Sequence, residues 1–121
     1  MAPISVGELI DKITILTIKV ARISDPLKIE NVIKELVQLR AIADNLEAPL
    51  ELNVYYTQLL TVNQDLWDIE DSKRKHEQEQ RFDNEFIKLA RQVYLKNDIR
   101  AKIKRDINVL VGSSIIEEKS Y

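Results

Sequence analysis

The chain lacks cysteine and has only two glycines and three prolines among its 121 residues. The absence of cysteine excludes disulfides, thiol nucleophiles and thiolate metal sites. So few glycines and prolines leave few turns, which argues against an all-β fold. The sequence therefore favours one helical domain of ordinary size, and a cysteine-free chain suits the reducing cytoplasm, where we expect the protein to act.

Long apolar runs and an excess of charge of one sign are also missing. No stretch approaches the roughly 18 apolar residues of a membrane span, and MAPISVGEL at the N-terminus lacks the features of a signal peptide. The net charge of −2 supplies no overall attraction to nucleic acid or to anionic lipid. We therefore expect no membrane span and no nucleic-acid partner.

Three segments instead carry apolar residues at alternating intervals of three and four. This spacing is typical of amphipathic helices that pack nearly parallel to one another. The three seams are Val6, Leu9, Ile13, Leu16, Val20 and Ile23; Ile29, Val32, Leu36, Leu39, Ala43 and Leu46; and Leu52, Tyr55, Leu59, Val62, Leu66 and Ile69. Short connections at residues 24–26 and 48–49 make neighbouring helices antiparallel.

Residues typical of helix ends bound these segments. Ser5 followed by Glu8 forms a capping box, and Asp25 and Asp83 are suitable caps for later helices. Gly112 is a natural stop. Residues 113–121 show no period and form a tail that either docks or stays free.

The third helix should continue beyond its apolar seam, because the next seam positions, Lys73 and His76, are polar. We expect that part to project from the bundle or lie on its surface, with His76 at the surface. Asn97 and Asp98 predict a kink or short break in the last segment. The expected fold is all-α: an antiparallel bundle of about four to five helices, in one domain over residues 1–121.

Ile15 falls in the middle of a polar face of the first helix. A lone exposed isoleucine is common in soluble proteins. Alternatively, this face contacts the C-terminal helix or another subunit. Long helices with few loops often need a partner to complete their core, and a closed dimer is the commonest outcome, so we expect a homodimer.

The first candidate site is a face of the third helix that carries Trp67, Glu70, Asp71 and Arg74 at helical spacing. Trp67 could stack on a sugar while the carboxylates bind its hydroxyls. The alternative is structural: Trp67 flanks the core, and the acids pair with neighbouring bases in solvent.

A magnesium site is a second hypothesis for the same region. Carboxylates are the ligands that Mg²⁺ prefers, but a helical carboxylate site usually needs ligands from a facing helix. Glu70 and Asp71 would need Glu8 and Asp11 of the first helix as partners. Otherwise we expect no cofactor.

The last segment supplies further candidates, in Arg91, Tyr94, Asn97 and Arg100. Guanidinium groups in a helical cleft suit phosphate or carboxylate recognition, because they offer a planar fork of donors. The alternative is internal pairing with the acids around Trp67. We expect Arg100 to be partly buried against Glu70 or Asp71, since an unpaired buried charge is costly.

Four blocks of the sequence, GELIDKITIL, LWDIEDSKR, FIKLARQVYLKNDIRAKIKRDIN and EEKSY, resemble a family of small bacterial proteins catalogued as a domain of unknown function. The resemblance spans Ser5 to Tyr121. It implies a free-standing cytoplasmic protein with a link to surface-polysaccharide genes and glycosyltransferases. It supplies no catalytic residues.

Three classes of function remain open from the sequence. The first is an interaction or scaffold protein of polysaccharide assembly, with a glycosyltransferase or sugar-nucleotide partner. The second is a binder of, or an enzyme acting on, an anionic sugar or nucleotide sugar, with Mg²⁺ as a possible requirement. Nucleic-acid binding ranks last, because acidic residues interleave with the basic ones.

Overall fold

The computed structural model describes residues 4–112. They form four helices: α1 (Val6–Arg22), α2 (Pro26–Asp44), α3 (Leu52–Gln78) and α4 (Asn84–Leu110). No strand occurs within residues 4–112. The prediction of an all-α bundle with a long third helix is confirmed, although α4 is as long as α3, at 27 residues. The tail at 113–121 lies outside the described residues.

Hydrogen bonds confirm the predicted capping residues, except that the Glu8 carboxylate pairs with Lys104 and does not complete the capping box. Ser5 Oγ accepts from the backbone N–H of Glu8 at 3.2 Å. Asp25 caps α2, and Asp83 Oδ1 accepts from the backbone of α4 at 3.1 Å. Gly112 follows α4 with a φ of 88°, in the left-handed region that glycine adopts without strain.

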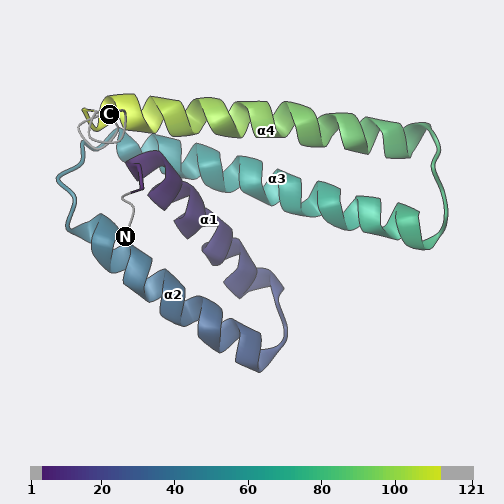
Figure 1. The fold of residues 1–121 in the computed structure, drawn as a ribbon, viewed down its shortest axis with the longest axis horizontal. Helices are drawn as coiled ribbons and strands as arrows, with labels where there is room; N and C mark the ends of the chain where they lie inside the picture. The colour runs from purple at the N-terminus through teal and green to yellow at the C-terminus, as the bar shows by residue number, and fades with distance from the viewer. Residues whose placement is uncertain (1–3, 113–121) are drawn as a thin grey trace.

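The helices form two antiparallel hairpins of unequal length (Figure 1). The shorter hairpin, α1 and α2, lies against one half of the longer hairpin, α3 and α4, and the other half of the longer hairpin projects beyond it. α1 packs against all three other helices, whereas α2 packs mainly against α1. Of the two positions expected for the end of the third helix, the structure shows projection beyond the shorter hairpin, with α4 alongside.

All four helices contribute apolar side chains to one core, which lies where the two hairpins meet. The buried core residues are Val6, Leu9, Ile10, Ile13, Leu16, Leu36, Leu59, Val62, Ile103 and Ile107. Most of them come from the predicted seams. α2 contributes only Leu36 to this buried set, so one side of α2 stays open to solvent. None of the four helices has the length and apolar character needed to cross a bilayer.

α4 corrects one prediction, because it runs without a break through Asn97 and Asp98. The apolar seam is interrupted there, but side chains rather than the backbone accommodate the polar residues. Arg100 reaches across to a carboxylate on α1, and Asn97 Oδ1 accepts from Arg100 at 3.4 Å. The helix therefore needs no kink to satisfy these groups.

Candidate functional site

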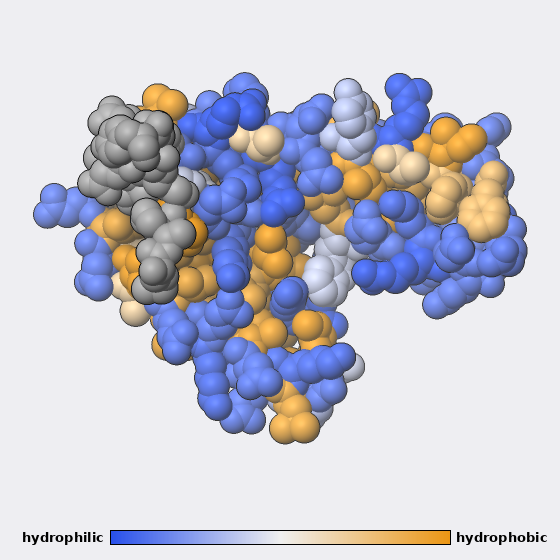
Figure 2. Space-filling model, in the orientation of Figure 1, coloured by the Kyte–Doolittle hydropathy of each residue, from blue (hydrophilic) through white to orange (hydrophobic). Residues whose placement is uncertain are grey.

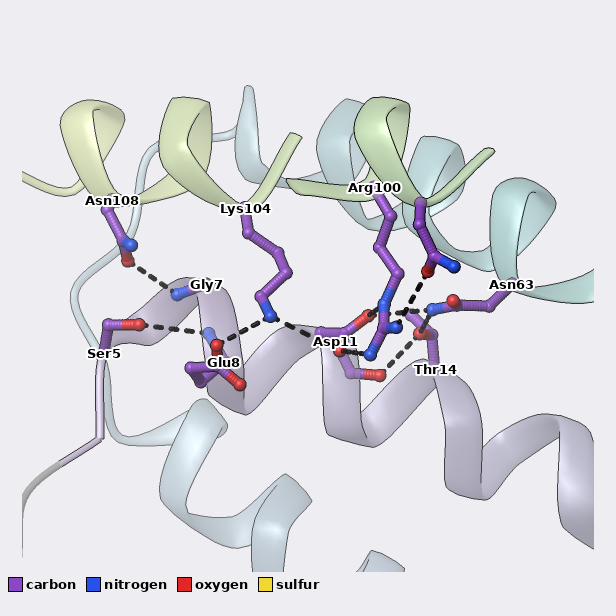
Figure 3. Close-up of polar contacts among 10 residues, drawn as sticks. Ser5, Gly7, Glu8, Asp11, Thr14, Asn63, Arg100, Lys104 and Asn108 are labelled. Carbon is purple, nitrogen blue, oxygen red and sulfur yellow. Dashed lines mark hydrogen bonds and ion pairs between the residues drawn. The ribbon is translucent and has the colours of Figure 1, made fainter. Parts of the chain in front are cut away.

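The centre of the site is Asp11, a carboxylate that α1 directs toward α4 (Figure 3). Arg100 of α4 donates two hydrogen bonds to it, from Nε to Oδ1 at 2.9 Å and from a terminal nitrogen to Oδ2 at 2.5 Å. The Asp11 side chain is only 4% exposed, and that of Arg100 is 29% exposed. A bidentate pair of this kind, with two hydrogen bonds from one guanidinium to one carboxylate, is among the strongest ion pairs that arginine forms.

Side chains from α1 and α3 complete the hydrogen bonding around Asp11. Asn63 Nδ2 of α3 donates to Asp11 Oδ1 at 2.9 Å and to Thr14 Oγ1 at 2.8 Å. Thr14 in turn donates to the backbone carbonyl of Asp11 at 2.7 Å. We call Asp11, Thr14, Asn63 and Arg100 the Asp11 network. Hydrogen bonds among these four side chains join α1, α3 and α4 (Figure 3).

The surroundings of Asp11 decide its ionisation. Burial alone raises the pKa of Asp11, but hydrogen bonds from Arg100 and Asn63, with the charges of Arg100 and Lys104, more than offset this. The pKa of Asp11 therefore lies below its usual range, and the group is a carboxylate at neutral pH. Lys104 also pairs with Glu8 at 2.6 Å.

The structure corrects the expected partner of Arg100, which is Asp11 rather than Glu70 or Asp71. Glu70 pairs with Lys73 at 3.5 Å, and Asp71 pairs with Arg74 at 3.1 Å, both within α3. The reason is the placement of α1, which packs against α4 at this point and brings its own carboxylate close to the guanidinium.

Part of the predicted binding group does come together beside the Asp11 network. A cleft of about 230 Å³ lies between α1, α3 and α4, and we call it the Trp67 cleft. Its lining residues are Ile15, Ile18, Asn63, Leu66, Trp67, Glu70, Arg74 and Arg100. On the face shown in Figure 2, polar side chains cover most of the surface, and apolar ones show in the angle between the two hairpins and near both ends of the longer hairpin.

The other predicted ligand-binding residues do not line this cleft. Asp71 and Asn97 are exposed and bond to Arg74 and Arg100, respectively. Arg91 and Tyr94 are also exposed, and Tyr94 has 66% of its surface open to solvent. The stripe through these two residues therefore faces away from the cleft.

A larger cleft of about 610 Å³ adjoins the first, and we call it the outer cleft. It is lined by Ile4, Glu8, Asp11, Lys12, Ile15, Leu16, Lys19, Glu35 and Arg100. Ile15 and Arg100 belong to both clefts. Ile15 is half-buried. Contacts within one chain therefore account for an apolar residue on this polar face.

The magnesium hypothesis finds no support in the positions of its four carboxylates. Glu8 and Asp11 are occupied by Lys104 and Arg100, and Glu70 and Asp71 pair within α3. Among residues 4–112, one group of three possible ligands does converge, formed by His76, Asp83 and Glu85.

His76 also corrects a prediction, because it is buried, with 6% exposure, rather than at the surface. The turn after α3 and the start of α4 fold over its ring. Helical periodicity could not show this, because the residues that cover His76 lie beyond a reversal of the chain.

Fold and site together define a small all-helical protein. The Asp11 network lies where α1, α3 and α4 meet, and its buried polar atoms all have hydrogen-bond partners. Arg100 lines both the Trp67 cleft and the outer cleft. The whole chain, residues 1–121, matches the model of a family described as a family of unknown function (DUF6165), and the chain belongs to that family. No curated protein and no solved structure matches it.

Proposed function

We propose that this protein is a non-enzymatic interaction protein that binds a partner protein at the Trp67 cleft. The size of the cleft is the observation that supports this most. At about 230 Å³ it is smaller than the roughly 300–1,000 Å³ of common small-molecule sites. That space suits one aromatic or aliphatic side chain of a partner, set between Trp67 and the side chains of Ile15 and Ile18 on α1.

The chemistry of the cleft also favours binding over catalysis. Within residues 4–112, every buried side-chain nitrogen and oxygen has a hydrogen-bond partner. Asp11, the most buried carboxylate, already accepts from Arg100 and Asn63, so it is poorly placed to act as a general base. Glu70 and Arg74 at the rim provide charges of both signs, which suit a polar rim around an apolar anchor.

The resemblance to proteins encoded near glycosyltransferases suggests the partner's setting. We propose that the partner is an enzyme of surface-polysaccharide assembly, and that the protein acts there as an accessory or scaffold. A partner of this kind needs no catalytic group from this chain, which agrees with the saturated network.

Photo-cross-linking in cells tests the proposed surface. A photoreactive phenylalanine derivative in place of Arg74, at the rim of the cleft, should capture one partner protein. The same derivative in place of Tyr94, exposed on the outer face of α4, is the matched control and should capture none. Adding Trp67→Ala to the Arg74 variant should reduce the yield about tenfold or more, since aromatic anchors carry much of the binding energy of an interface.

The melting temperature of the Trp67→Ala protein shows whether a lower cross-linking yield results from unfolding of the protein instead. Equal capture from both positions, or capture that survives Trp67→Ala in a folded protein, contradicts the proposal. Identification of the captured protein by mass spectrometry then decides whether it belongs to polysaccharide assembly.

A second candidate function is binding of an anionic sugar or nucleotide sugar. The outer cleft favours it, because its volume of about 610 Å³ lies within the usual range for small ligands and Lys12, Lys19 and Arg100 line it. Lys12 pairs with Glu35 at 3.0 Å and Arg100 pairs with Asp11, so an anion would have to compete with these carboxylates. Specific stabilisation by one nucleotide sugar in a thermal-shift screen, without capture of any protein from position 74, would support this function over the first.

We also propose that the protein forms a homodimer, through the open side of α2. This helix packs mainly against α1 and exposes four large apolar side chains: Leu27, Ile33, Val37 and Ile42. Sedimentation equilibrium at micromolar concentration should give twice the mass of one chain, and Val37→Glu should shift the mass toward the monomer. A monomer at all concentrations contradicts the dimer.

A further inference from the structure

The tip of the α3–α4 hairpin, beyond the end of the Trp67 cleft, brings together a histidine and two carboxylates. His76 lies in the last turn of α3, Asp83 caps α4, and Glu85 belongs to the first turn of α4. His76 Nε2 is 3.7 Å from Asp83 Oδ1 and 3.6 Å from Glu85 Oε2. All three ligand atoms lie within 4.8 Å of one another.

The backbone of the turn builds this group. Gln80 adopts a φ of 54°, and the backbone N–H of Arg81 donates back to the carbonyl of His76 at 2.9 Å. This reversal folds the start of α4 over the imidazole. The ring of Phe86 lies 6.0 Å from that of His76, and the His76 side chain is only 7% exposed. The imidazole is therefore held in one orientation.

The hydrogen bonds of His76 fix its tautomer. Nδ1 lies 2.9 Å from the backbone carbonyl of Ser72, which can only accept, so Nδ1 carries the proton. When the ring carries only this proton, Nε2 presents a lone pair on the side of the two carboxylates. Metal-binding histidines commonly have this arrangement, in which the other ring nitrogen donates to a carbonyl.

Three acceptors that face one another attract a cation. In the structure that cation is Arg81, whose terminal nitrogen lies 3.2 Å from His76 Nε2 and whose Nε lies 3.8 Å from Asp83. Arg81 also lies 3.5 Å from Glu79, and about half of its side chain is exposed. It can therefore swing toward Glu79 and leave the three ligands to another cation.

We propose that His76, Asp83 and Glu85 bind a divalent transition-metal ion of the Zn²⁺ class, in exchange with Arg81. One imidazole and two carboxylates suit Zn²⁺, whereas Mg²⁺ and Ca²⁺ prefer oxygen ligands alone. Bonds of about 2.0 Å at a tetrahedral angle place ligand atoms about 3.3 Å apart. Only small movements of the two carboxylates are needed, and Glu85 in particular is exposed. The ion would tie the end of α3 to the start of α4.

The chain contains a single histidine, which provides a direct test. Zn²⁺ alone is titrated into the untagged full chain, and nitrogen-15 NMR follows the one imidazole. The Nε2 resonance should move and saturate, while the Nδ1 proton stays in place. Competition with a chromophoric chelator gives the affinity of each variant.

Three exposed-side-chain variants separate metal binding from nonspecific attraction. Glu85→Gln should weaken Zn²⁺ binding about tenfold or more, because it removes a ligand. Arg81→Gln should strengthen binding, because it removes the competing cation. Glu77→Gln, the same chemical change on the nearby surface of α3, should leave the affinity unchanged. An imidazole signal unmoved by millimolar Zn²⁺, or equal weakening by Glu85→Gln and Glu77→Gln, overturns the proposal.

Discussion

Arg100→Met should lower the free energy of unfolding by about 3 kcal/mol, because it leaves the buried Asp11 carboxylate without its main partner. Removing one member of a buried ion pair costs about 3–5 kcal/mol. We expect the lower end of that range, since the Arg100 side chain is 29% exposed and Lys104 remains 3.9 Å from Asp11. Urea denaturation at pH 7 measures the change.

Two further variants show whether the Asp11 contact causes this loss. Arg91→Met makes the same chemical change on the exposed face of α4 and should alter stability by less than about 0.5 kcal/mol. Asp11→Leu combined with Arg100→Met should recover much of the loss, because neither charge then remains buried. Equal effects of Arg100→Met and Arg91→Met contradict the assignment.

The free energy of unfolding at acidic pH gives an independent test of the contact between Asp11 and Arg100. The pKa of Asp11 is lower in the folded protein than in the unfolded chain, so its ionisation adds stability above about pH 4. That contribution is lost as the pH falls through the folded-state pKa. Arg100→Met removes the hydrogen bonds and the charge that lower this pKa. The stability difference between the two proteins should therefore be smaller at pH 3 than at pH 7.

Gly7→Ala should destabilise the protein by about 2–3 kcal/mol, although alanine is the better helix former. In an exposed helix the change would stabilise by up to about 1 kcal/mol. Here the new Cβ would lie 2.5 Å from the backbone carbonyl oxygen of Lys104 and 3.1 Å from Oδ1 of Asn108. Overpacking of this kind costs about 1–3 kcal/mol, and a helix backbone cannot move aside as a side chain can.

Gly112→Ala is the comparison for this substitution. A Cβ there meets no atom of residues 4–112 within 4 Å, and the expected cost, about 1 kcal/mol, comes from the positive φ. Thermal and urea unfolding should therefore rank Gly7→Ala as the more damaging change. A stabilised Gly7→Ala protein would show that α1 and α4 do not approach each other as closely as described.

The helices and their ends could be predicted from the sequence because the signals are local. Alternating three- and four-residue spacing marks the buried side of each helix, and caps such as Asp25 and Asp83 satisfy backbone groups only a few residues away. Short connections then fix antiparallel neighbours. None of these inferences depends on how one helix is rotated against a distant one.

The candidate site was harder to predict because its contacts join distant parts of the chain. Asp11 and Arg100 are 89 residues apart, and periodicity does not determine which face of α1 meets α4. Arg100 was expected to be partly buried, but its partner depended on that rotation. A signal was present in Asp11, Thr14 and Asn63, polar residues beside apolar seams. The burial of His76 carried no comparable signal.

The packing of α1 against α4 also has a consequence for synthesis on the ribosome. The backbone N–H of Gly7 donates to Asn108 at 2.7 Å, across 101 residues of sequence. At about 5–20 residues per second, α1 emerges about 5–20 s before the helix that covers it. During that interval α2 is its nearest available neighbour, whereas α3 and α4 can pair with each other as soon as both have emerged. We therefore expect the α1–α4 contact to form last, and nascent chains to expose the side of α1 that faces α4 until α4 is complete.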